Sequence, residues 1–512
     1  MPVKFEIKKQ TYFDSVTLMQ INTEVKKLPG IENAIIGMGT DFNLQSARRV
    51  NLWNPEFEAL TPSDLLICIE SGSIESALKG IEEAKALLSR KSSRSSGNSE
   101  IRPSSQTAAA RMLTDANMVI ISVPGAFAAR EADIALDSDR HVMLFSDNVT
   151  VEEELRLKQK ALSKGLLLMG PDCGTAIINN IPLAFANVVG KGDIGLVAAS
   201  GTGLQEVTCV IDHLGSGISQ AIGVGGRDLS EKIGGLMTIG AVEALASDPS
   251  TRVITLISKP PAETVLPKLF SELKKVTKPI VIYFIGADPQ IISKAGFTPA
   301  ATLEDAAIKA CEISSGKRLE SLMSDTAIND LAGKTKPDGK FIRGLYSGGT
   351  LCDEAQRLLL PITGEMNSNT PIKGVKKCQD LFKSTGHSII DLGDDDFTRG
   401  KAHPMIDPDT RKERIITESM DPDAGLIFMD LVMGWGSHPD MATELSNAIR
   451  TARKKSKRNP IFAVTICGTP KDPQNYKKQW QIMEECGAIV FPTNVSMVKF
   501  IKKVISREGK NV

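Results

Sequence analysis

The 512-residue chain has little that would attract a nucleic acid or a membrane. Its 61 Lys and Arg residues balance its 61 Asp and Glu residues, so there is no net field to recruit such a partner. No apolar run approaches the ~18 residues of a membrane span, and the charged start Met-Pro-Val-Lys-Phe-Glu differs from the apolar region of a signal peptide. We therefore expect a cytoplasmic protein that binds neither nucleic acid nor membrane. Any anion site must then be local.

Several motifs of well-known chemistry are also missing. The eight cysteines form no Cys-x-x-Cys pair, which leaves a zinc site or a disulfide framework unsupported, and we predict no metal site. The Gly-rich segment 223–226 lacks the Gly-x-Gly-x-x-Gly spacing of a dinucleotide fingerprint, and the chain contains no P-loop, no Gly-x-Ser-x-Gly elbow and no His-Glu-x-x-His helix. NAD binding, P-loop NTPase activity, serine hydrolysis and metalloprotease activity therefore lack support.

Aromatic residues make up only 5% of the chain, although hydrophobic residues make up 41%. Apolar runs of four to six residues alternate with helix-length segments almost throughout, which predicts βαβ units and mainly parallel sheets. We expect an α/β protein of three Rossmann-like or flavodoxin-like domains. Their predicted bounds are 1–190, with a disordered Ser-rich insertion at 91–107, then 191–315, a linker at 316–340, and 341–512.

Two similar turns each join a strand to a helix. One is Ser200-Gly-Thr after the apolar run that begins at Ile194, and the other is Ser347-Gly-Gly-Thr after the run that begins at Phe341. A helix N-terminus presents unpaired N–H groups and the positive end of the peptide dipole, so two such turns would clamp one phosphate or carboxylate between them. Either turn alone is equally explained by ordinary helix capping. The predicted anion-binding residues are Ser200, Gly201, Thr202, Ser347, Gly348, Gly349 and Thr350.

Glycine-rich segments follow other predicted strands. Such glycines let the backbone turn sharply at the carboxyl ends of strands, where α/β proteins collect their ligands. The alternative for the first of these segments is a rigid exit loop between domains. The candidate substrate-loop residues are Asp172, Cys173, Gly174, Gly225, Gly226, Gly434 and Gly436.

Charged side chains near these loops have a functional and a structural interpretation each. Arg227 is a candidate for binding a carboxylate or phosphate, or else pairs with a structural acid. Lys259 faces the site or only solvent. His403 is a candidate proton carrier, or orders its own loop. The acidic run 394–396 is a candidate for holding Mg²⁺, but we favour a solvated acidic loop.

These motifs resemble two parts of succinyl-CoA synthetase. The segments 170–177, 194–203 and 223–226 are similar to the α subunit, and the segment from Ser347 to Gly434 is similar to the carboxyl-terminal domain of the β subunit. The closer resemblance is to the FdrA family of acyl-CoA synthetase-like proteins. That family shares the runs Phe145–Val149, Gly170–Thr175, Gly225–Ser230, Ser258–Ala262 and His403–Pro408.

The resemblance implies identities for the domains: a CoA-binding-like domain at 1–190, an α-subunit-like domain at 191–315 and a β-subunit-like domain at 341–512, without an ATP-grasp domain. It also implies that phosphate binds at the two Ser/Gly turns. Two family features are absent, however. The segment 286–296 lacks the histidine that the synthetases phosphorylate, and the segment 8–15 lacks the glycine loop that holds CoA.

The implied activity is acyl or carbamoyl transfer from an acyl phosphate, without a phosphohistidine. In that scheme Arg227 and Lys259 bind the acid substrate and His403 carries a proton. One branch of the family is associated with oxamate carbamoyltransferase activity in purine catabolism, acting with partner subunits. The alternatives are therefore a subunit of such a complex and a noncatalytic anion-binding subunit. CoA, phosphate and Mg²⁺ are the candidate cofactors, and partner subunits or further copies of the chain are the expected assembly partners.

Overall fold

The computed structural model describes residues 2–11, 13, 15–50, 52–93, 103, 105–399 and 401–508. The chain divides into two compact units. The first, the N-terminal unit, comprises Met1–Arg102 with Leu392–Thr410, and the second, the main unit, comprises Pro103–Asp391 with Arg411–Val512. Among the described residues, no helix combines the length and the apolar character needed to cross a bilayer.

The N-terminal unit is built on a three-stranded antiparallel sheet of order β1-β3-β2. Alternate residues of the central strand face two small cores: Leu65 and Ile67 pack with the helices α1 and α3, whereas Leu66 and Cys68 pack beside Phe57. The elements are β1 (Val3–Lys8), α1 (Ser15–Lys26), β2 (Ile31–Met38), α2 (Asp41–Arg49), the 3₁₀ helix η1 (Pro55–Ala59), β3 (Leu65–Ser71), α3 (Ile74–Ser93) and α14 (Asp395–Thr398).

This unit corrects the expected single domain over 1–190. The first three strands pair antiparallel with one another and close a core of their own, so they do not extend the parallel sheet that follows. Of the expected Ser-rich insertion 91–107, residues 91–93 complete α3. The Ser105 hydroxyl caps the helix α4 (Gln106–Met112) by accepting from Ala108 N at 3.2 Å. Residues 94–102 and 104 lie outside the described residues.

The main unit begins with a small parallel sheet of order β4-β5-β6. Its central strand is buried except at its first residue, and helices α5 and α6 pack against the sheet and each other. Its elements are α4 (Gln106–Met112), β4 (Met118–Ile121), α5 (Gly125–Asp137), β5 (His141–Leu144), α6 (Val151–Ser163) and β6 (Leu168–Met169).

The second sheet of the main unit has seven strands in the order β13-β12-β11-β9-β10-β7-β8. The strands from β13 to β10 run parallel, and β7 and β8 form an antiparallel hairpin at one edge. Its strands are β7 (Thr175–Ile178), β8 (Ile181–Ala184), β9 (Lys191–Ala198), β10 (Ile218–Gly223), β11 (Val253–Ser258), β12 (Ile280–Phe284) and β13 (Thr298–Pro299). Its helices are α7 (Gly201–His213), α8 (Leu236–Ser247), α9 (Leu266–Leu273), α10 (Pro289–Lys294) and α11 (Leu303–Ser315).

The third sheet also has seven strands, all parallel, in the order β16-β15-β17-β14-β18-β19-β20. Its strands are β14 (Phe341–Tyr346), β15 (Asn367–Ser368), β16 (Lys376–Lys377), β17 (Ser388–Asp391), β18 (Ala424–Val432), β19 (Ile461–Cys467) and β20 (Ile489–Phe491). The helices that accompany it are α12 (Asp325–Lys334), α13 (Gly349–Thr363), α15 (Asp409–Met420), α16 (Met441–Ser456), α17 (Tyr476–Glu485) and α18 (Asn494–Glu508). The expected α/β class with mainly parallel sheets is confirmed.

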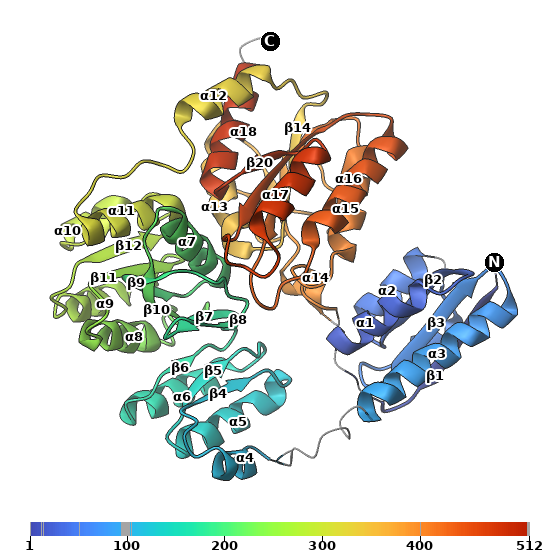
Figure 1. The fold of residues 1–512 in the computed structure, drawn as a ribbon, viewed down its shortest axis with the longest axis horizontal. Helices are drawn as coiled ribbons and strands as arrows, with labels where there is room; N and C mark the ends of the chain where they lie inside the picture. Colours follow the sequence, from blue (N-terminus) through green and yellow to red (C-terminus); the bar gives the residue numbers. More distant parts are fainter. Residues whose placement is uncertain are drawn as a thin grey trace. The chain divides into compact units, whose positions relative to one another are not determined.

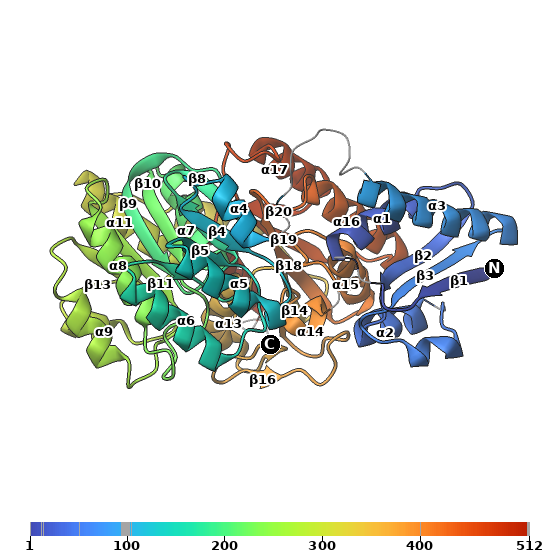
Figure 2. The same ribbon diagram turned by 90° about the horizontal axis from the view of Figure 1, so that it is seen from below.

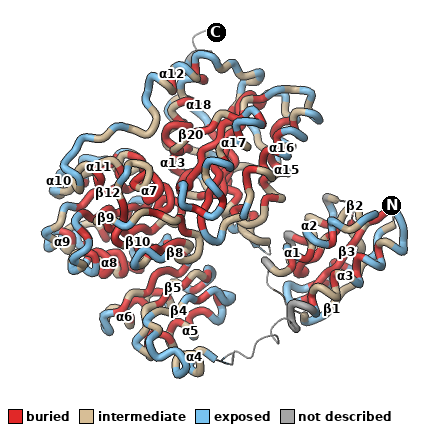
Figure 3. Tube along the Cα trace, in the orientation of Figure 1, coloured by how far each residue is buried: buried red, intermediate tan, exposed pale blue. Residues whose placement is uncertain are grey.

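Two cores lie on opposite faces of the second sheet. Leu196 of β9 points into a core that contains α7 and α11 and continues into the third sheet, whereas its neighbour Val197 points into a core with α5, α6, α8 and α9. Helices α7 and α13 pack against each other where the two large sheets meet (Figure 1). Figure 2 shows the strands of these two sheets from below. Figure 3 shows how thoroughly these strands are buried. The shared core therefore fixes the starts of both helices.

Candidate functional site

The first predicted turn caps helix α7 and leaves two N–H groups open. The Ser200 backbone is extended, and its hydroxyl accepts a hydrogen bond from Gly203 N at 3.1 Å. Leu204 N donates to the Ser200 carbonyl at 3.2 Å. The N–H groups of Gly201 and Thr202 have no acceptor among the described residues. The start of α7 thus keeps the polarity that suits an anion.

The second predicted turn, before α13, already faces an anion within the chain. The carboxylate of Asp430 accepts from Ser347 N at 2.8 Å, from the Ser347 hydroxyl at 2.9 Å and from Gly348 N at 2.7 Å. Asp430 is fully buried on β18, next to the strand that leads into the turn. A second buried carboxylate, Asp391, lies so close to Gly349 that a Cβ there would be 2.7 Å from its Oδ2. This turn is therefore a poor place for a further negative group.

Arg411 balances the charge of Asp430. Its Nη2 lies 3.2 Å from Asp430 Oδ1 and also donates to the Asp430 carbonyl. The Arg411 side chain is 1% exposed, and its Nε and Nη1 atoms are buried without a partner. Burial lowers the pKa of Arg411, and the carboxylate opposes that shift. The pair is a buried ion pair whose stability depends on both partners.

The two turns meet. The hydroxyls of Ser200 and Thr350 are in hydrogen-bond contact, and Thr350 N donates to Thr202 Oγ1 at 3.4 Å. A Cβ at Gly348 would lie 2.8 Å from Thr202 Cγ2, and one at Gly203 would lie 3.0 Å from Thr350 Cγ2. The structure therefore brings the predicted clamp residues together, with an open turn on the α7 side and an occupied turn on the α13 side. Phosphate binding between them stays a prediction.

Buried carboxyl groups support both helices one to two turns beyond their starts. Glu206 of α7 accepts from Asn494 N at 2.9 Å, and Glu354 of α13 accepts from Asn494 Nδ2 at 2.9 Å and from Leu303 N at 2.9 Å. Burial raises the pKa of Glu206 to about 8 and that of Glu354 to about 7. Asn494 thus ties the two helices together through groups that titrate near neutral pH.

Two of the predicted glycine loops pack tightly on each other. A Cβ at Gly225 would lie 2.4 Å from the Pro171 carbonyl oxygen, and one at Gly223 would lie 2.4 Å from the Thr175 carbonyl oxygen. Cys173 Sγ donates to the Gly223 carbonyl at 3.4 Å, and burial raises the pKa of this thiol to about 12. Cys173 is therefore a packing residue of this junction and not a thiolate nucleophile at neutral pH.

The other loop residues have separate places. A Cβ at Gly434 would lie 2.6 Å from the Ala186 carbonyl oxygen, so this loop is pressed against the segment that leads into β9. The Asp172 N–H donates to Ser146 O at 3.0 Å, and the Gly174 carbonyl accepts from Phe185 N at 2.9 Å. Gly436 faces the Phe185 ring, whereas a Cβ at Gly226 would find open space. Close backbone approach explains the glycines at 223, 225 and 434 without a ligand.

Arg227 pairs with a structural acid, which is one of the two interpretations that the sequence left open. Its Nη2 lies 2.9 Å from Glu154 Oε2 and donates to the Val149 carbonyl at 2.8 Å. Glu154 also binds the buried Lys158, whose Nζ lies 2.7 Å from Asp228 Oδ1. Arg227 belongs to this four-residue charge network and pairs with Glu154.

Lys259 lies beside α13. Its Nζ is 2.8 Å from Oδ2 of Asp353, a buried carboxyl group on the helix turn that follows Thr350. Burial raises the pKa of Asp353, and the Lys259 ammonium opposes that shift. Lys259 therefore joins the end of β11 to α13 close to the meeting point of the two turns.

His403 and the acidic run belong to the N-terminal unit. His403 Nδ1 accepts from Met405 N at 3.2 Å, and its carbonyl accepts from Ile406 N at 2.7 Å. Asp394 caps α14 by accepting from Asp396 N at 3.1 Å. The described residues contain no group of three or more His, Cys, Asp or Glu side chains placed to hold a metal ion. A proton-carrying role for His403 stays a prediction.

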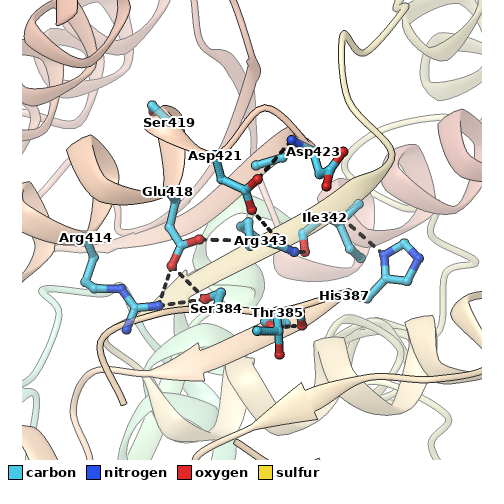
Figure 4. Close-up of polar contacts among 12 residues, drawn as sticks. Ile342, Arg343, Ser384, Thr385, His387, Arg414, Glu418, Ser419, Asp421 and Asp423 are labelled. Carbon is cyan, nitrogen blue, oxygen red and sulfur yellow. Dashed lines mark hydrogen bonds and ion pairs between the residues drawn. The ribbon is translucent and has the colours of Figure 1, made fainter. Parts of the chain in front are cut away.

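Two further buried arginines of the third sheet, Arg343 and Arg414, pair with acids near the amino end of β14. Arg343 donates from Nε to Glu418 at 3.1 Å and lies 2.6 Å from Asp421 Oδ2 (Figure 4). Arg414 contacts the other Glu418 oxygen, which also accepts from the Ser384 hydroxyl at 2.6 Å. This cluster holds the strand and its neighbouring helix together and leaves no charge unbalanced.

Sequence reasoning assigned no role to Asp430, Arg411, Asp353, Glu206 or Glu354. Each acts through a contact with a residue far away in the chain, such as the 83 positions between Ser347 and Asp430. A usable signal existed only for Asp430, which directly follows the apolar run Leu426–Met429 at the expected carboxyl end of a strand.

Three family models match the chain. The model described as "CoA-ligase" matches residues 345–504, "CoA binding domain" matches 190–286, and "AllF, heavy metal-associated domain" matches 1–105. The CoA-binding description therefore falls on the second sheet and not on residues 1–190, where the sequence resemblance placed it.

Relatives match either nearly the whole chain or about a third of it. YahF of Escherichia coli K12, described as an uncharacterized protein, is 42% identical over 497 residues and covers 96% of both chains. Subunit alpha 2 of an ADP-forming succinate–CoA ligase from Archaeoglobus fulgidus is 26% identical over 34% of this chain, and the match spans 60% of that subunit. SauD, a subunit of the ADP-forming sulfoacetate-CoA ligase of Bilophila wadsworthia, is 27% identical over 33% of this chain and 60% of its own length.

Among solved structures, the apo form of a dinucleotide-forming acetyl-coenzyme A synthetase from Ca. Korarchaeum cryptofilum is 15% identical, with a TM-score of 0.33. It covers 76% of this chain and 83% of its own.

The heavy-metal description of the first model can be tested against the N-terminal unit. Cys68 is the only cysteine in residues 1–105, and this stretch has no histidine. The Cys68 side chain is buried, its Sγ donates to the Leu52 carbonyl, and burial raises the pKa of the thiol to about 12. Soft metals are bound by thiolates and imidazoles, so these residues do not fit a heavy-metal site.

Proposed function

This chain belongs to the acyl-CoA synthetase-like family, and on that premise we propose that it takes part in acyl or carbamoyl transfer from an acyl phosphate bound at the start of α7. The observation that carries the proposal is the meeting of the α7 and α13 starts through Ser200, Thr202 and Thr350, with the N–H groups of Gly201 and Thr202 open. The phosphate belongs on the α7 side, because Asp430 already occupies the other turn.

The proposed transfer reaction needs little more than the positive polarity of the open N–H groups at the start of α7. An acceptor attacks the carbonyl carbon of the acyl phosphate, the bond from that carbon to the phosphate oxygen breaks, and the phosphate leaves with the electron pair. Negative charge grows on the leaving oxygen, and the open N–H groups at Gly201 and Thr202 are preorganised to stabilise it. The acceptor's proton passes to phosphate or solvent.

A covalent phosphohistidine has no support in the main unit. Among its described histidines, His213 stands at the far end of α7 with Nε2 2.9 Å from the Gly468 carbonyl oxygen. His141, His387 and His438 each accept a backbone N–H through Nδ1, from Leu167, Ile342 and Asp440 respectively. Direct transfer between two bound substrates suits this arrangement better than a relay through the enzyme.

A second candidate function is a noncatalytic subunit that binds the anion for a partner enzyme. The fixed carboxylate of Asp430 favours it, because only one of the two turns remains to hold a ligand. CoA is a candidate acceptor in view of the matching CoA-binding and CoA-ligase descriptions, and oxamate is the candidate for carbamoyl transfer.

Calorimetric titration with inorganic phosphate, acetyl phosphate and carbamoyl phosphate tests the site. We expect binding that falls at least about tenfold in Gly201→Val, because the added methyl groups cover the open N–H groups. Apart from the chain neighbours and the backbone of its own helix, the described atom nearest to a Cβ at Gly201 is Thr175 Oγ1 at 3.4 Å, so the fold should accept the change. Gly72→Val is the matched control, since a Cβ at Gly72 meets nothing within 4 Å.

Turnover separates the two candidate functions. Release of phosphate from either acyl phosphate, in the presence of CoA or oxamate, supports an enzyme. Binding without release until a partner protein is added supports the noncatalytic subunit. Equal binding by the wild type and Gly201→Val would contradict the site itself.

A further inference from the structure

We infer that Arg357, together with Lys259, forms a second oxyanion subsite about two helical turns along α13 from the proposed phosphate position. The inference rests on the proposed function and adds to it a residue that determines which ligands the site accepts. The group bound there is a carboxylate or phosphate, carried either by the far end of the transferred acid or by a separate ligand.

Helix α13 runs across the carboxyl ends of three neighbouring strands. Thr350, Asp353 and Arg357 follow the spacing that places residues on one face of a helix. Thr350 contacts Ser200 beyond β9, Asp353 pairs with Lys259 beyond β11, and Arg357 lies against Gly286 beyond β12. Strands β9, β11 and β12 are adjacent in that order. The seven-residue step from Thr350 to Arg357 spans about 10 Å of helix.

Arg357 has a charge with no partner. It is half-buried, its Nε is buried without a hydrogen bond, and no ion pair joins its guanidinium to another described residue. The fully buried Arg343 shows the usual arrangement, because both Glu418 and Asp421 pair with it. Leaving the buried Nε of this guanidinium without an acceptor is costly, so the site points to an anion that supplies one.

The backbone at Gly286 is shaped for this guanidinium. A Cβ at Gly286 would lie 1.8 Å from Arg357 Cζ and 1.9 Å from its Nη2, so only glycine leaves room. Gly286 also has a φ of +84°, a conformation that side chains disfavour. The Gly286 backbone therefore lies directly against the guanidinium.

Lys259 has two carboxylates near it, the directly paired Asp353 and the buried Asp391, whereas Arg357 has no direct ion pair among the described residues. Asp353 carries one negative charge between Lys259 and Arg357, and its direct ion pair, at 2.8 Å, is with Lys259. Lys259 is 63% exposed, so a ligand can approach from solvent at this point. Arg357 presents a planar set of donors that matches a carboxylate or phosphate, and the exposed ammonium adds a second charge. An oxyanion beside Arg357 would supply the direct partner that this guanidinium lacks.

Calorimetry with paired probes tests the subsite. Propylphosphonate carries only the group for the α7 turn, whereas 4-phosphonobutyrate adds a carboxylate. If the second group belongs to the same ligand, we expect 4-phosphonobutyrate to bind about tenfold or more tightly than propylphosphonate, with the gain lost in Arg357→Gln. If it belongs to a separate ligand, pyrophosphate should bind protein saturated with propylphosphonate, again only with Arg357 present.

Two further variants protect the test against simple misfolding. Gly286→Ala displaces the guanidinium without removing it, so it should abolish the same gain while propylphosphonate still binds. Arg252→Gln is the matched control, because Arg252 is exposed and paired with Asp193 at the opposite end of β11. It should bind all three probes as the wild type does.

The outcomes separate the two proposals. Binding of propylphosphonate with no Arg357-dependent gain for either the carboxylate or pyrophosphate overturns the subsite and leaves the proposed function standing. A gain that survives in Arg357→Gln or Gly286→Ala overturns it as well. Failure of the wild type to bind any phosphonate overturns the proposed function, and the subsite with it.

Discussion

The starts of α7 and α13 look alike in sequence and differ in charge. Each has a serine and a glycine between a buried strand and a helix. At α7 the Ser200 hydroxyl accepts from the helix backbone, as a capping residue does, and two N–H groups stay open. At α13 the Ser347 hydroxyl donates to Asp430, which also takes two N–H groups of the turn. A neighbouring strand therefore decides whether the motif can bind a ligand.

The largest effect that this comparison predicts concerns Asp430. Asp430→Ala removes the carboxylate that four groups share and leaves the buried Arg411 charge unpaired, so we expect a loss of about 4 kcal/mol in unfolding free energy. Urea unfolding of the main unit, followed by the fluorescence of Trp435 and Trp480, measures it.

An exposed aspartate provides the control for this measurement. Asp325 pairs with Lys499 at 3.0 Å and is 76% exposed, so Asp325→Ala should cost less than about 1 kcal/mol. If Asp430→Ala lost no more than Asp325→Ala, the occupied turn would not depend on its carboxylate, and the contrast between the two helix starts would fail.

The next effect is on the pH dependence of stability, in which the two helices resemble each other because each carries a buried glutamate. Because burial raises the pKa of Glu206 to about 8 from its ordinary 4.5, the folded state holds a proton that the unfolded state releases. Stability from this group is present below about pH 4.5 and is lost as the pH rises toward 8. Glu206→Gln should remove this slope and gain about 3 kcal/mol relative to the wild type between pH 5 and 8. Urea midpoints across that range measure it.

Glu354→Gln sharpens the same comparison. Both Glu354 oxygens accept hydrogen bonds, from Leu303 N on one side and Asn494 Nδ2 on the other. A glutamine would set its own NH₂ group against one of these donors. We therefore expect this variant to flatten the pH dependence while lowering stability at every pH, unlike Glu206→Gln. A steep slope that survives in both variants would rule these carboxyl groups out as its source.

A smaller loss of stability is expected when an added side-chain atom crowds the contact between the two helix starts. A Cβ at Gly203 would lie 2.6 Å from Ser200 Oγ and 3.0 Å from Thr350 Cγ2, so Gly203→Ala must shift one helix start. We expect a cost of about 2 kcal/mol, which is typical of overpacking. Gly226→Ala has open space and should stay within about 0.5 kcal/mol of the wild type. Thermal unfolding of both variants decides between a tight and a loose junction.

The sequence was informative where one residue's neighbours along the chain determine its structure. The run from Ile194 is buried on both faces of a parallel sheet, and such a run is continuously apolar, so strand β9 and the following cap were predictable. The antiparallel strand β1 was not predicted, because it alternates charged and apolar residues and so differs from the continuously apolar runs that marked the other strands.

The site was less predictable, because its electrostatics depend on partners far away in the chain. Asp430 reaches Ser347 only because β18 pairs with β14 in a register that sets Met429 opposite Leu345. Arg227 pairs with Glu154, which lies 73 positions earlier in the chain. The surroundings of Arg357 depend on Gly286, which the fold brings against its guanidinium. Pairwise strand register and helix crossing are tertiary facts that a local motif does not contain.

The smallest effect separates the two serines. Ser200→Ala removes a cap whose hydroxyl accepts from Gly203 N at 3.1 Å, which should cost about 1 kcal/mol. It leaves the open N–H groups of Gly201 and Thr202 in place, so phosphate affinity should fall only a few-fold. Ser347→Ala removes a donor to Asp430, which keeps its two backbone N–H groups and Arg411, so it should leave phosphate affinity unchanged. Calorimetry on both variants would contradict the assignment of the ligand to α7 if Ser347→Ala weakened phosphate binding more than Ser200→Ala.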